Sequence, residues 1–373
     1  MQGGVGDYTH QLALALAALG AEVHVVTRRA SAEVRASAFR VHAVVGRWSL
    51  GALFQIRALA ASLGLDFLNL QYQAAAYDLS APIHFLPRLI GLGRPARPTK
   101  TVVTFHDLRI PYLFPKAGAL RPAAVTYLAR TASGVIATDP ADLAELRRRG
   151  VAQVTQIPIG SNIAPAPPAG YDRLAWRDQW GVGPQEILLG YFGFLNASKG
   201  GDLLIEALAC LAEGGAPVKL VLIGGRTGTS DATNAAFGDE LDERIAARHL
   251  GGRIMRSGFV AAAEVSAHLL ACDLLVLPYR DGVSFRRGSF MAALAHGCPI
   301  ISTRPAQPLA ELRHGENICL VPPDSAEALT QAVRELMSQP QQRARLGEGA
   351  RKLAALFAWD KIAARTLEFY RTL

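Results

Sequence analysis

Four polar or glycine-rich stretches in the second half of the chain contain residue types that bind phosphate. They are GFLNASKGG (193–201), GGRTGTSD (224–231), SGFV (257–260) and YRDGVSFRRGS (279–289). Each follows a hydrophobic run, and three precede a helical pattern. Backbone N–H groups at a helix N-terminus bind anions, as do lysine and arginine side chains. With Lys199, Arg286 and Arg287, these stretches predict a diphosphate site, ordinary connecting loops being the alternative.

Two stretches of the first half contain further candidates. The chain opens with GGVGDYT, which reads as a loop whose glycines permit a ligand to approach the backbone closely. It has neither the dinucleotide pattern GxGxxG nor the GK[ST] of a Walker loop. His106 ends the strand-like run KTVVTFHD, where it is either a functional group facing a cleft or a structural residue. Because no DxD ends a predicted strand and no Cys/His spacing fits a metal, we expect no metal and no cofactor.

These residues need a scaffold that brings strand ends together, and the hydrophobic pattern predicts one. Strand-like runs alternate with helical runs in both halves, which is typical of doubly wound parallel α/β sheets. Ligands of such sheets bind beyond the carboxyl ends of the strands. The stretch IAPAPPAG indicates a linker at 164–170. We therefore predict two Rossmann-like domains, 1–163 and 171–358.

The pattern also predicts the individual elements. The expected strands are 21–27, 39–45, 66–73, 100–107, 133–139, 153–160, 186–195, 218–225, 252–260, 273–279, 299–303 and 318–323. The expected helices are 11–19, 49–64, 80–92, 119–132, 140–149, 200–215, 235–248, 263–272, 289–297, 325–337, 341–357 and 359–372. The first strand of such a sheet normally feeds the first glycine-rich loop, and only two residues precede that loop here. We expect the first domain to lack its first strand, the missing piece lying upstream.

Charge and cysteine content narrow the possible partners and the compartment. Residues 1–165 contain 17 Lys and Arg against 9 Asp and Glu, and the remaining residues contain 22 of each, so the net charge of +8 lies in the first half. This asymmetry favours an anionic partner such as phosphate or a lipid surface. The four cysteines stand singly in apolar surroundings and predict buried, reduced thiols. No apolar run reaches the roughly 18 to 20 residues of a membrane span, so we expect a cytoplasmic protein.

Taken in order, the motifs resemble those of one enzyme family. GGVGDYT, EVHVVT, TFHD, IPIGSN, GFLNASKGGDLLIEAL, LVLIGG, DLLVLPY and MAALAHGCPIIST look like a retaining glycosyltransferase of family 4 with the GT-B fold. The resemblance implies two Rossmann-like domains facing across a cleft, with the donor nucleotide on the second and the acceptor on the first. It also implies a last helix, about 359–373, that crosses back to the first domain.

The resemblance assigns roles to the candidate residues. The implied catalytic residues are His106, Lys199 and Ser284. The implied donor-binding residues are Gly4, Gly6, Asp7, Gly193, Phe194, Asn196, Lys199, Gly224, Gly225, Gly258, Phe259, Val260, Arg286, Arg287, Gly288 and Ser289. The function implied is metal-independent hexosyl transfer, with retention, from a nucleoside-diphosphate sugar to a glycolipid, a cell-envelope polysaccharide or another acceptor.

The sequence departs from the family pattern at three donor-site positions. Phe194 stands where the family has an arginine, and Ser284 and Ala292 stand where it has two glutamates. Arg286 and Arg287 are placed to restore the positive charge. Losing a ribose carboxylate weakens nucleotide binding by about 1.5 to 3 kcal/mol. Catalysis survives this loss if the leaving phosphate takes the acceptor proton and the protein supplies positioning and charge stabilisation.

Other functions stay open at this stage. The absent glutamates favour a catalytically degenerate nucleotide-sugar binding protein. A nicotinamide-dependent dehydrogenase is disfavoured because neither half has GxGxxG with an acidic residue about 20 positions on. Nucleic-acid binding is disfavoured because the second half is neutral, whereas peripheral contact with an anionic membrane suits the basic first half. Tyr112, Leu113 and Phe114 are candidates for an acceptor pocket or a packed loop.

Overall fold

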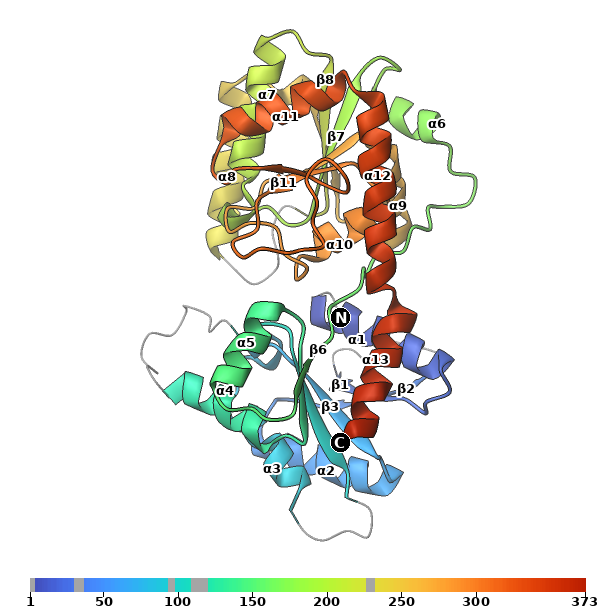
Figure 1. Cartoon of the computed structure of the whole chain (residues 1–373), viewed down its shortest axis with the longest axis vertical. Helices are drawn as coiled ribbons and strands as arrows, with labels where there is room; N and C mark the ends of the chain where they lie inside the picture. Colours follow the sequence, from blue (N-terminus) through green and yellow to red (C-terminus); the bar gives the residue numbers. More distant parts are fainter. Residues whose placement is uncertain (1–3, 30–36, 93–97, 109–119, 226–231) are drawn as a thin grey trace. The chain divides into compact units, whose positions relative to one another are not determined.

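A computed structural model describes residues 4–29, 37–92, 98–108, 120–225 and 232–373 (Figure 1). The chain divides into two compact units. Unit 1 comprises Met1–Gly160 together with Phe357–Leu373, and unit 2 comprises Ser161–Leu356. The expected linker 164–170 falls within unit 2.

Unit 1 contains two parallel sheets. Its strands are β1 (His24–Arg28), β2 (Arg40–Val45), β3 (Phe67–Tyr72), β4 (Lys100–Phe105), β5 (Gly134–Ala137) and β6 (Val154–Gln156). Its helices are α1 (Gly4–Ala18), α2 (Leu50–Leu63), η2 (Ala74–Tyr77), η3 (Ala81–Phe85), α3 (Leu86–Ile90), α4 (Leu120–Thr131), α5 (Pro140–Arg148) and α13 (Trp359–Thr372), with η7 (Ala355–Phe357) just before α13. β1 pairs with β2, and a separate sheet has the order β3-β4-β5-β6. Within the described residues no strand joins the two sheets, and the missing first strand stays a prediction.

The chain is helical from Gly4 onward, which corrects the prediction of a loop at Gly4, Gly6 and Asp7. α1 begins at Gly4, so Gly4, Gly6 and Asp7 lie in its first turn. Glycines are tolerated there because the first four N–H groups of a helix have no intrahelical partner. The predicted helix 80–92 is likewise interrupted, since Pro82 and Pro87 start two short helices, η3 and α3.

The last helix of the chain belongs to the core of unit 1. α13 packs on α1, and Ile362, Ala363 and Tyr370 are buried with Leu12 and Ile136 in one hydrophobic cluster. The Asn69 side chain on β3 donates a hydrogen bond to the Tyr370 hydroxyl over 2.7 Å. Residues from both ends of the sequence therefore stabilise the same sheet.

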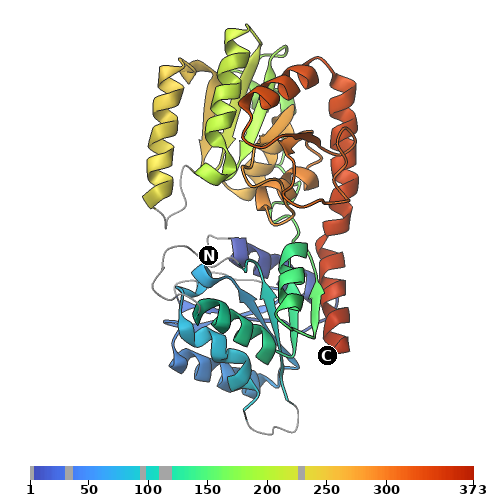
Figure 2. The ribbon, with the colours of Figure 1, turned by 60° about the vertical axis from the view of Figure 1, so that its left-hand side comes forward.

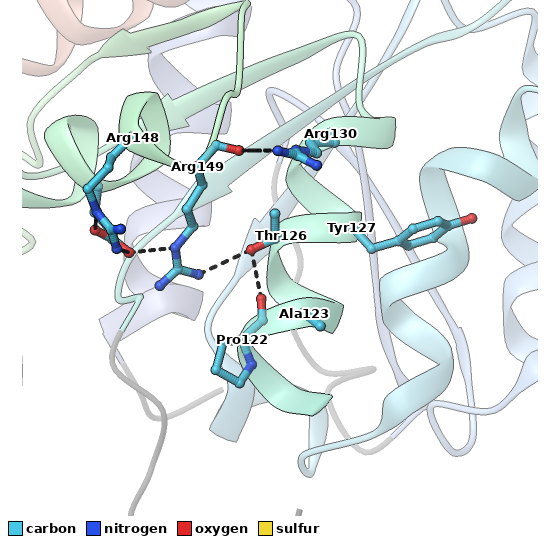
Figure 3. Close-up of a pocket in the computed structure, with 8 residues that line it drawn as sticks. Pro122, Ala123, Thr126, Tyr127, Arg130, Arg148 and Arg149 are labelled. Atoms are coloured by element: carbon cyan, nitrogen blue, oxygen red, sulfur yellow. Dashed lines mark hydrogen bonds and ion pairs between the residues drawn. The ribbon is translucent and has the colours of Figure 1, made fainter. Parts of the chain in front are cut away.

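α4 and α5 of unit 1 enclose a hollow with arginines around it (Figure 3). The Arg130 guanidinium donates to the Arg149 carbonyl over 2.7 and 3.0 Å. Glu145 accepts hydrogen bonds from both Arg148 and Arg149. Arg149 also lies 3.4 Å from the Thr126 hydroxyl. The Glu145 carboxylate thus binds two guanidinium groups, and the third, Arg130, binds a backbone carbonyl.

Unit 2 is built on one six-stranded parallel sheet. Its strands are β7 (Ile187–Phe192), β8 (Val218–Ile223), β9 (Ile254–Gly258), β10 (Leu274–Leu277), β11 (Ile300–Thr303) and β12 (Cys319–Val321). Its helices are α6 (Arg173–Asp178), η5 (Ala197–Lys199), α7 (Gly201–Glu213), α8 (Ala232–Ala247), η6 (Gly251–Arg253), α9 (Ala262–Ala271), α10 (Gly288–Ala295), α11 (Ala326–Met337) and α12 (Pro340–Ala354). The strand order β12-β11-β10-β7-β8-β9 is doubly wound about β7, as predicted. Helices cover both faces of the sheet (Figures 1 and 2).

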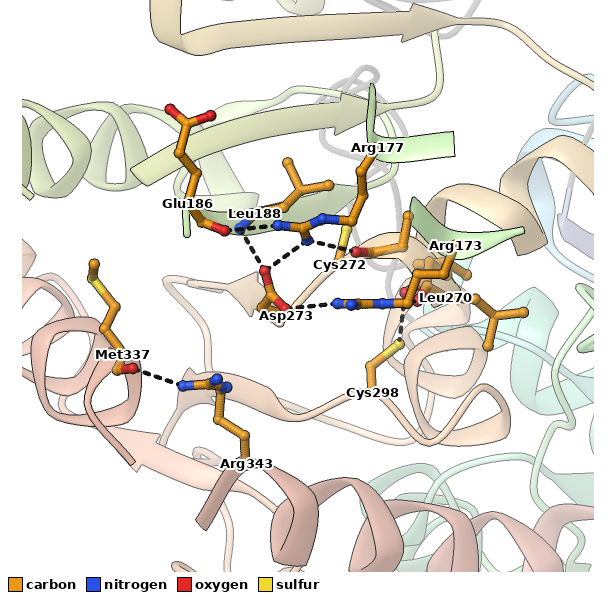
Figure 4. Close-up of polar contacts among 12 residues, drawn as sticks. Arg173, Arg177, Glu186, Leu188, Leu270, Cys272, Asp273, Cys298, Met337 and Arg343 are labelled. Carbon is orange, nitrogen blue, oxygen red and sulfur yellow. Dashed lines mark hydrogen bonds and ion pairs between the residues drawn. The ribbon is translucent and has the colours of Figure 1, made fainter. Parts of the chain in front are cut away.

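One half-buried aspartate fixes the start of the two central strands of unit 2 (Figure 4). Asp273 precedes β10 and accepts hydrogen bonds from Arg177 over 2.7 Å and from Arg173 over 2.6 Å. It also accepts from the Leu188 N–H of β7 over 2.8 Å. Since Arg173 and Arg177 lie on α6, a helix that the sequence pattern did not predict, this helix is tied to the sheet. Breaking such a buried ion pair costs about 3 to 5 kcal/mol.

The structure also tests the prediction of buried cysteines and shows whether its helices could span a membrane. The described cysteines are free, and Cys272 and Cys298 are buried, but Cys210 is exposed on α7, contrary to the prediction of four buried thiols. None of the helices described is both long and apolar enough to cross a membrane. No group of three or more His, Cys, Asp or Glu side chains in the described part of the chain is arranged to hold a metal ion.

Candidate functional site

The loop after β7 places Lys199 at the carboxyl edge of the unit 2 sheet. The Asn196 side chain caps η5 by accepting the Lys199 N–H over 3.1 Å and the Ser198 hydroxyl over 2.9 Å. Gly200 follows in the left-handed region, with φ of 66°. A Cβ at Gly200 would lie 2.1 Å from the Pro278 carbonyl oxygen, so only glycine allows this loop to meet the end of β10.

Three glycines bring the ends of β7, β8 and β9 together. The Gly193 N–H donates to the Ile223 carbonyl over 3.0 Å, and the Gly224 N–H donates to the Ser257 hydroxyl over 3.0 Å. Gly224 also forms a β-bridge with Gly258. A Cβ at Gly193, whose φ is 125°, would lie 3.1 Å from Lys199 Nζ and 3.8 Å from Ser289 Oγ. Lys199 and Ser289 therefore flank one open stretch of backbone.

The loop after β10 adds an arginine that is held from two sides. Arg287, the residue before α10, forms an ion pair with Asp281. Its guanidinium carbon lies 4.7 Å from the centroid of the Tyr279 ring, a cation–π distance. The buried Tyr279 hydroxyl lies 2.6 Å from Ser289 Oγ. Tyr279 and Asp281 thus orient Arg287 and Ser289, and they are the site residues that the sequence reasoning missed.

The two cations of this edge affect one another. Burial lowers the pKa of the Lys199 ammonium to about 8, and the nearby positive charge of Arg287 acts in the same direction. Lys199 is therefore charged at neutral pH without a carboxylate close enough to raise its pKa. An arrangement of this kind stabilises a bound anion, because the anion relieves the repulsion between the two cations.

Two aromatic side chains at the same edge are exposed. Phe194 is 43% and Phe259 is 70% exposed, which is unusual for side chains of this size. Lys199 Nζ lies 5.9 Å from the Phe194 ring centroid. These rings offer faces on which a planar group can stack.

The remaining predicted residues of unit 2 lie around this cluster. Ser284 is half-buried, and its carbonyl accepts the Arg287 N–H over 3.1 Å. Ala292 is fully buried in α10, so a carboxylate in its place would be desolvated. Arg286, Gly225 and Val260 are half-buried and Gly288 is exposed. Residues 226–231 of the predicted loop 224–231 lie outside the described residues.

The candidate histidine of unit 1 is neutral and partly enclosed. His106 directly follows β4, as predicted, and its Nε2 lies 3.0 Å from the Gln71 amide oxygen. Because that oxygen accepts, Nε2 holds the proton and Nδ1 is an acceptor. The Tyr8 ring packs edge-on at 4.6 Å between centroids. Burial lowers the pKa of His106 to about 4, which keeps the imidazole uncharged at neutral pH.

Not all predicted residues gather at these places. Gly4, Gly6 and Asp7 lie on the first turn of α1 in unit 1, one turn from Tyr8. The aromatic candidates Tyr112, Leu113 and Phe114 lie outside the described residues. The structure thus gathers two sets, one around Lys199 in unit 2 and one around His106 in unit 1.

Comparison with known families decides what kind of protein has this architecture. Residues 172–353 match the family described as "Glycosyl transferases group 1", and residues 3–160 match "Glycosyl transferase 4-like domain". The chain belongs to these glycosyltransferases. The resemblance drawn from the sequence motifs is therefore confirmed.

Curated relatives of this glycosyltransferase have low sequence identity but align with most of the chain. It is 26% identical to the D-inositol 3-phosphate glycosyltransferase of Kineococcus radiotolerans, over 99% of this chain and 90% of that protein. It is 27% identical to a GDP-mannose-dependent alpha-(1-6)-phosphatidylinositol dimannoside mannosyltransferase of Mycobacterium tuberculosis, over 64% of this chain and 58% of that protein.

Solved structures share the fold over nearly the whole chain. Sucrose-phosphate synthase of Thermosynechococcus elongatus matches with a TM-score of 0.75 at 22% identity, covering 99% of this chain and 93% of that one. Anabaena Alr3699/HepE, in complex with UDP-glucose, matches with a TM-score of 0.75 at 20% identity, covering 100% and 98%. These likenesses confirm the predicted GT-B architecture, with its four-stranded sheet in unit 1 and its six-stranded sheet in unit 2.

Proposed function

We propose that this glycosyltransferase moves a hexosyl group, with retention of configuration, from a nucleoside-diphosphate sugar bound to unit 2. The observation behind this proposal is the convergence of Lys199, Arg287 and Ser289 beside the open backbone at Gly193. Two cations and a hydroxyl at the carboxyl edge of a parallel sheet fit a diphosphate. The solved relative in complex with UDP-glucose supports a donor of this class.

The chemistry asked of these side chains is electrostatic. The bond between the anomeric carbon and the diphosphate oxygen breaks, and the acceptor oxygen bonds to the same face of that carbon. The leaving phosphate takes the acceptor proton. Lys199 and Arg287 stabilise the charge that develops on the diphosphate, and no protein nucleophile or bound metal takes part in the proposed step. Phe259 supplies a stacking face for the base.

The acceptor is proposed from the names of the relatives and from the charge of the chain. The two relatives described above have a phosphorylated inositol or a phosphatidylinositol glycan in their names. A phosphate-bearing acceptor such as a glycolipid precursor of the cell envelope suits the basic first half of this chain. Such an acceptor would place the enzyme, as a peripheral protein, at the inner face of a membrane.

Thermal unfolding with UDP, GDP, ADP and NAD tests the donor proposal. A ligand at about 100 times its Kd adds roughly 2.7 kcal/mol to the free energy of unfolding, which shifts the melting temperature by several degrees. We expect one nucleoside diphosphate to stabilise the wild type but not Lys199→Ala. The matched control is Lys352→Ala, which removes an exposed lysine elsewhere in unit 2. Stabilisation by NAD alone would instead favour a dehydrogenase.

A catalytically degenerate nucleotide-sugar binding protein is the second candidate. It is favoured because Ser284 and Ala292 stand where the family pattern has two glutamates. Ala292 is also fully buried, so its side chain has no access to a ligand. Release of free nucleoside diphosphate from a mixture of donor sugars, in the presence of a lipid extract, separates the two. Steady turnover excludes the degenerate protein, whereas stabilisation without turnover supports it.

A further inference from the structure

One helical layer of unit 1 exposes an unusual amount of apolar surface. α2, η3, α3 and α4 contact one another beside the sheet. Ten large hydrophobic side chains are exposed among the described residues, and five of them belong to this layer. They are Leu50, Phe54, Phe85, Leu92 and Tyr127. Phe54 is 55% and Phe85 is 50% exposed, and the Phe85 ring packs against Tyr127 at 5.5 Å between centroids.

α2 shows how this surface arises from the sequence. Its residues, LGALFQIRALAASL, are apolar nearly all round, and Arg57 is their single charge. Leu53 and Ile56 are buried against the core, yet Leu50 and Phe54 form an apolar ridge on the opposite side. A surface helix of a globular protein normally has a polar outer face. α2 departs from that pattern at Leu50 and Phe54.

Charge on the same layer has one sign. α2, η3, α3 and α4 contain no aspartate or glutamate, and arginines are spaced along them at Arg57, Arg88 and Arg130. The hollow between α4 and α5 adjoins this layer through Tyr127 and Arg130 (Figure 3). Its α5 side has Arg148 and Arg149, which form ion pairs with Glu145. Its volume is about 460 Å³, enough for a phosphate headgroup.

We propose that this layer is the face by which the protein docks on an anionic phospholipid bilayer. Leu50, Phe54 and Phe85 enter the interface between headgroups and acyl chains, and the arginines contact lipid phosphates. The four helices combine exposed apolar side chains with arginines and contain no acidic residue, which is the composition that binds at this depth. This docking would bring the enzyme to a lipid-linked acceptor, and that purpose rests on the proposed function.

A second copy of the chain is the other occupant to consider. Two identical faces in a symmetric dimer would bring arginine against arginine, with no carboxylate on either helical layer to pair them. The charge of the face is instead complementary to anionic lipid. The apolar ridge of Leu50 and Phe54 adds a contribution that salt does not screen. Salt would therefore remove a purely electrostatic contact completely but would only weaken this one.

Co-sedimentation of the full chain with vesicles tests the proposal. Vesicles of phosphatidylcholine are compared with an equal mixture of phosphatidylcholine and phosphatidylglycerol, at low and high salt. We expect the mixed vesicles to bind the protein and high salt to weaken the binding without abolishing it. Phe54→Ser with Phe85→Ser lowers the partition coefficient about tenfold, from the apolar area no longer buried. Arg88→Ala, which removes an exposed arginine of the layer, lowers it about fivefold.

Matched controls keep the outcome specific. Leu174→Ser removes an exposed apolar side chain of unit 2, and Arg345→Ala removes an exposed arginine there. Both are expected to bind vesicles like the wild type. The nucleotide-induced shift of the melting temperature, measured on every variant, reports that unit 2 is intact and tests the donor proposal separately.

Three results would overturn the docking surface. They are no binding of the wild type to mixed vesicles, unchanged binding of the double phenylalanine variant, and a wild-type dimer that this variant converts to a monomer. If vesicle binding fails while nucleotide still stabilises the protein, the proposed glycosyl transfer stands without this surface. If the protein binds vesicles while no nucleotide stabilises it, the docking surface stands and the proposed donor site fails.

Discussion

The carboxyl edges of the β3–β6 sheet of unit 1 and of the six-stranded sheet of unit 2 differ in charge. In unit 1 the strand β4 ends at His106, a neutral imidazole bonded to Gln71 and packed on Tyr8. In unit 2 the strands end around Lys199 and Arg287, two cations with one nearby carboxylate. Burial acts on both edges, but it leaves the lysine charged at neutral pH and the histidine uncharged. A neutral acceptor of hydrogen bonds suits a sugar hydroxyl, whereas paired cations suit a diphosphate.

The largest expected effect comes from removing the unit 2 lysine. Lys199→Ala should lower kcat/KM for sugar transfer by roughly 100- to 1,000-fold, the loss typical of one preorganised charge at a transition state. Initial rates with the donor that stabilises the wild type measure it. Lys352→Ala is the control, and near-normal turnover of Lys199→Ala would place the diphosphate elsewhere.

Variants of Arg287 and of its partner Asp281 distinguish the charge of the arginine from its positioning. Arg287→Ala should weaken diphosphate binding about 10- to 100-fold, as for the loss of a hydrogen bond to a charged group. Asp281→Asn keeps the arginine but removes its ion pair, so we expect a smaller loss, mainly in kcat. Calorimetric titration of the nucleoside diphosphate measures the affinity of Arg287→Ala, and initial rates measure the kcat of Asp281→Asn, with Arg345→Ala as control in both. Equal affinities for Arg287→Ala and wild type would contradict the site.

Titration of Lys199 predicts a pH dependence for the donor edge alone. Since the pKa of the free lysine is about 8, deprotonation above that pH removes a charge that binds the diphosphate. Affinity should therefore fall with rising pH, by at most about fivefold between pH 8 and 9. The dependence should disappear in Lys199→Ala. A wild-type affinity that is flat across this range would show that the lysine does not meet the phosphate.

The smallest expected effect belongs to the unit 1 edge. His106→Asn should raise KM for the acceptor a few-fold and leave the affinity for nucleoside diphosphate unchanged. No inflection near pH 6.5 is expected in the wild-type rate, because the pKa of His106 is about 4. A rate profile from pH 5 to 8 checks this. An inflection that vanishes in His106→Asn would mean that the imidazole gains a proton in the working enzyme.

Sequence patterns predicted the fold better than they predicted the contacts of the site. The alternation of apolar runs identified all twelve strands of the described residues, because buried parallel strands are nearly uninterrupted hydrophobic segments. The same pattern missed α6, whose six residues are too few to show a helical period. It also placed Cys210 in the core, although this residue falls on the exposed face of α7.

Site residues were predictable where a single stretch contained them. Lys199 follows a strand and precedes a helix, so its position at the sheet edge follows from the sequence. The roles of Tyr279 and Asp281 do not, because they depend on contacts with Arg287 and Ser289 that only the folded loop creates. Gly4 and Gly6 were misread as a loop because glycine marks both loops and helix starts.

The place of α13 in the core of unit 1 has a consequence for biosynthesis. A ribosome completes unit 2 before it adds the residues from Phe357 onward, so unit 1 acquires α13 only after unit 2 has been synthesised. Until then Gly134 on β5 lacks the cover of Phe369 and Leu373, whose side chains lie against it in the finished protein. The half of the enzyme that is synthesised first is therefore the half that finishes folding last.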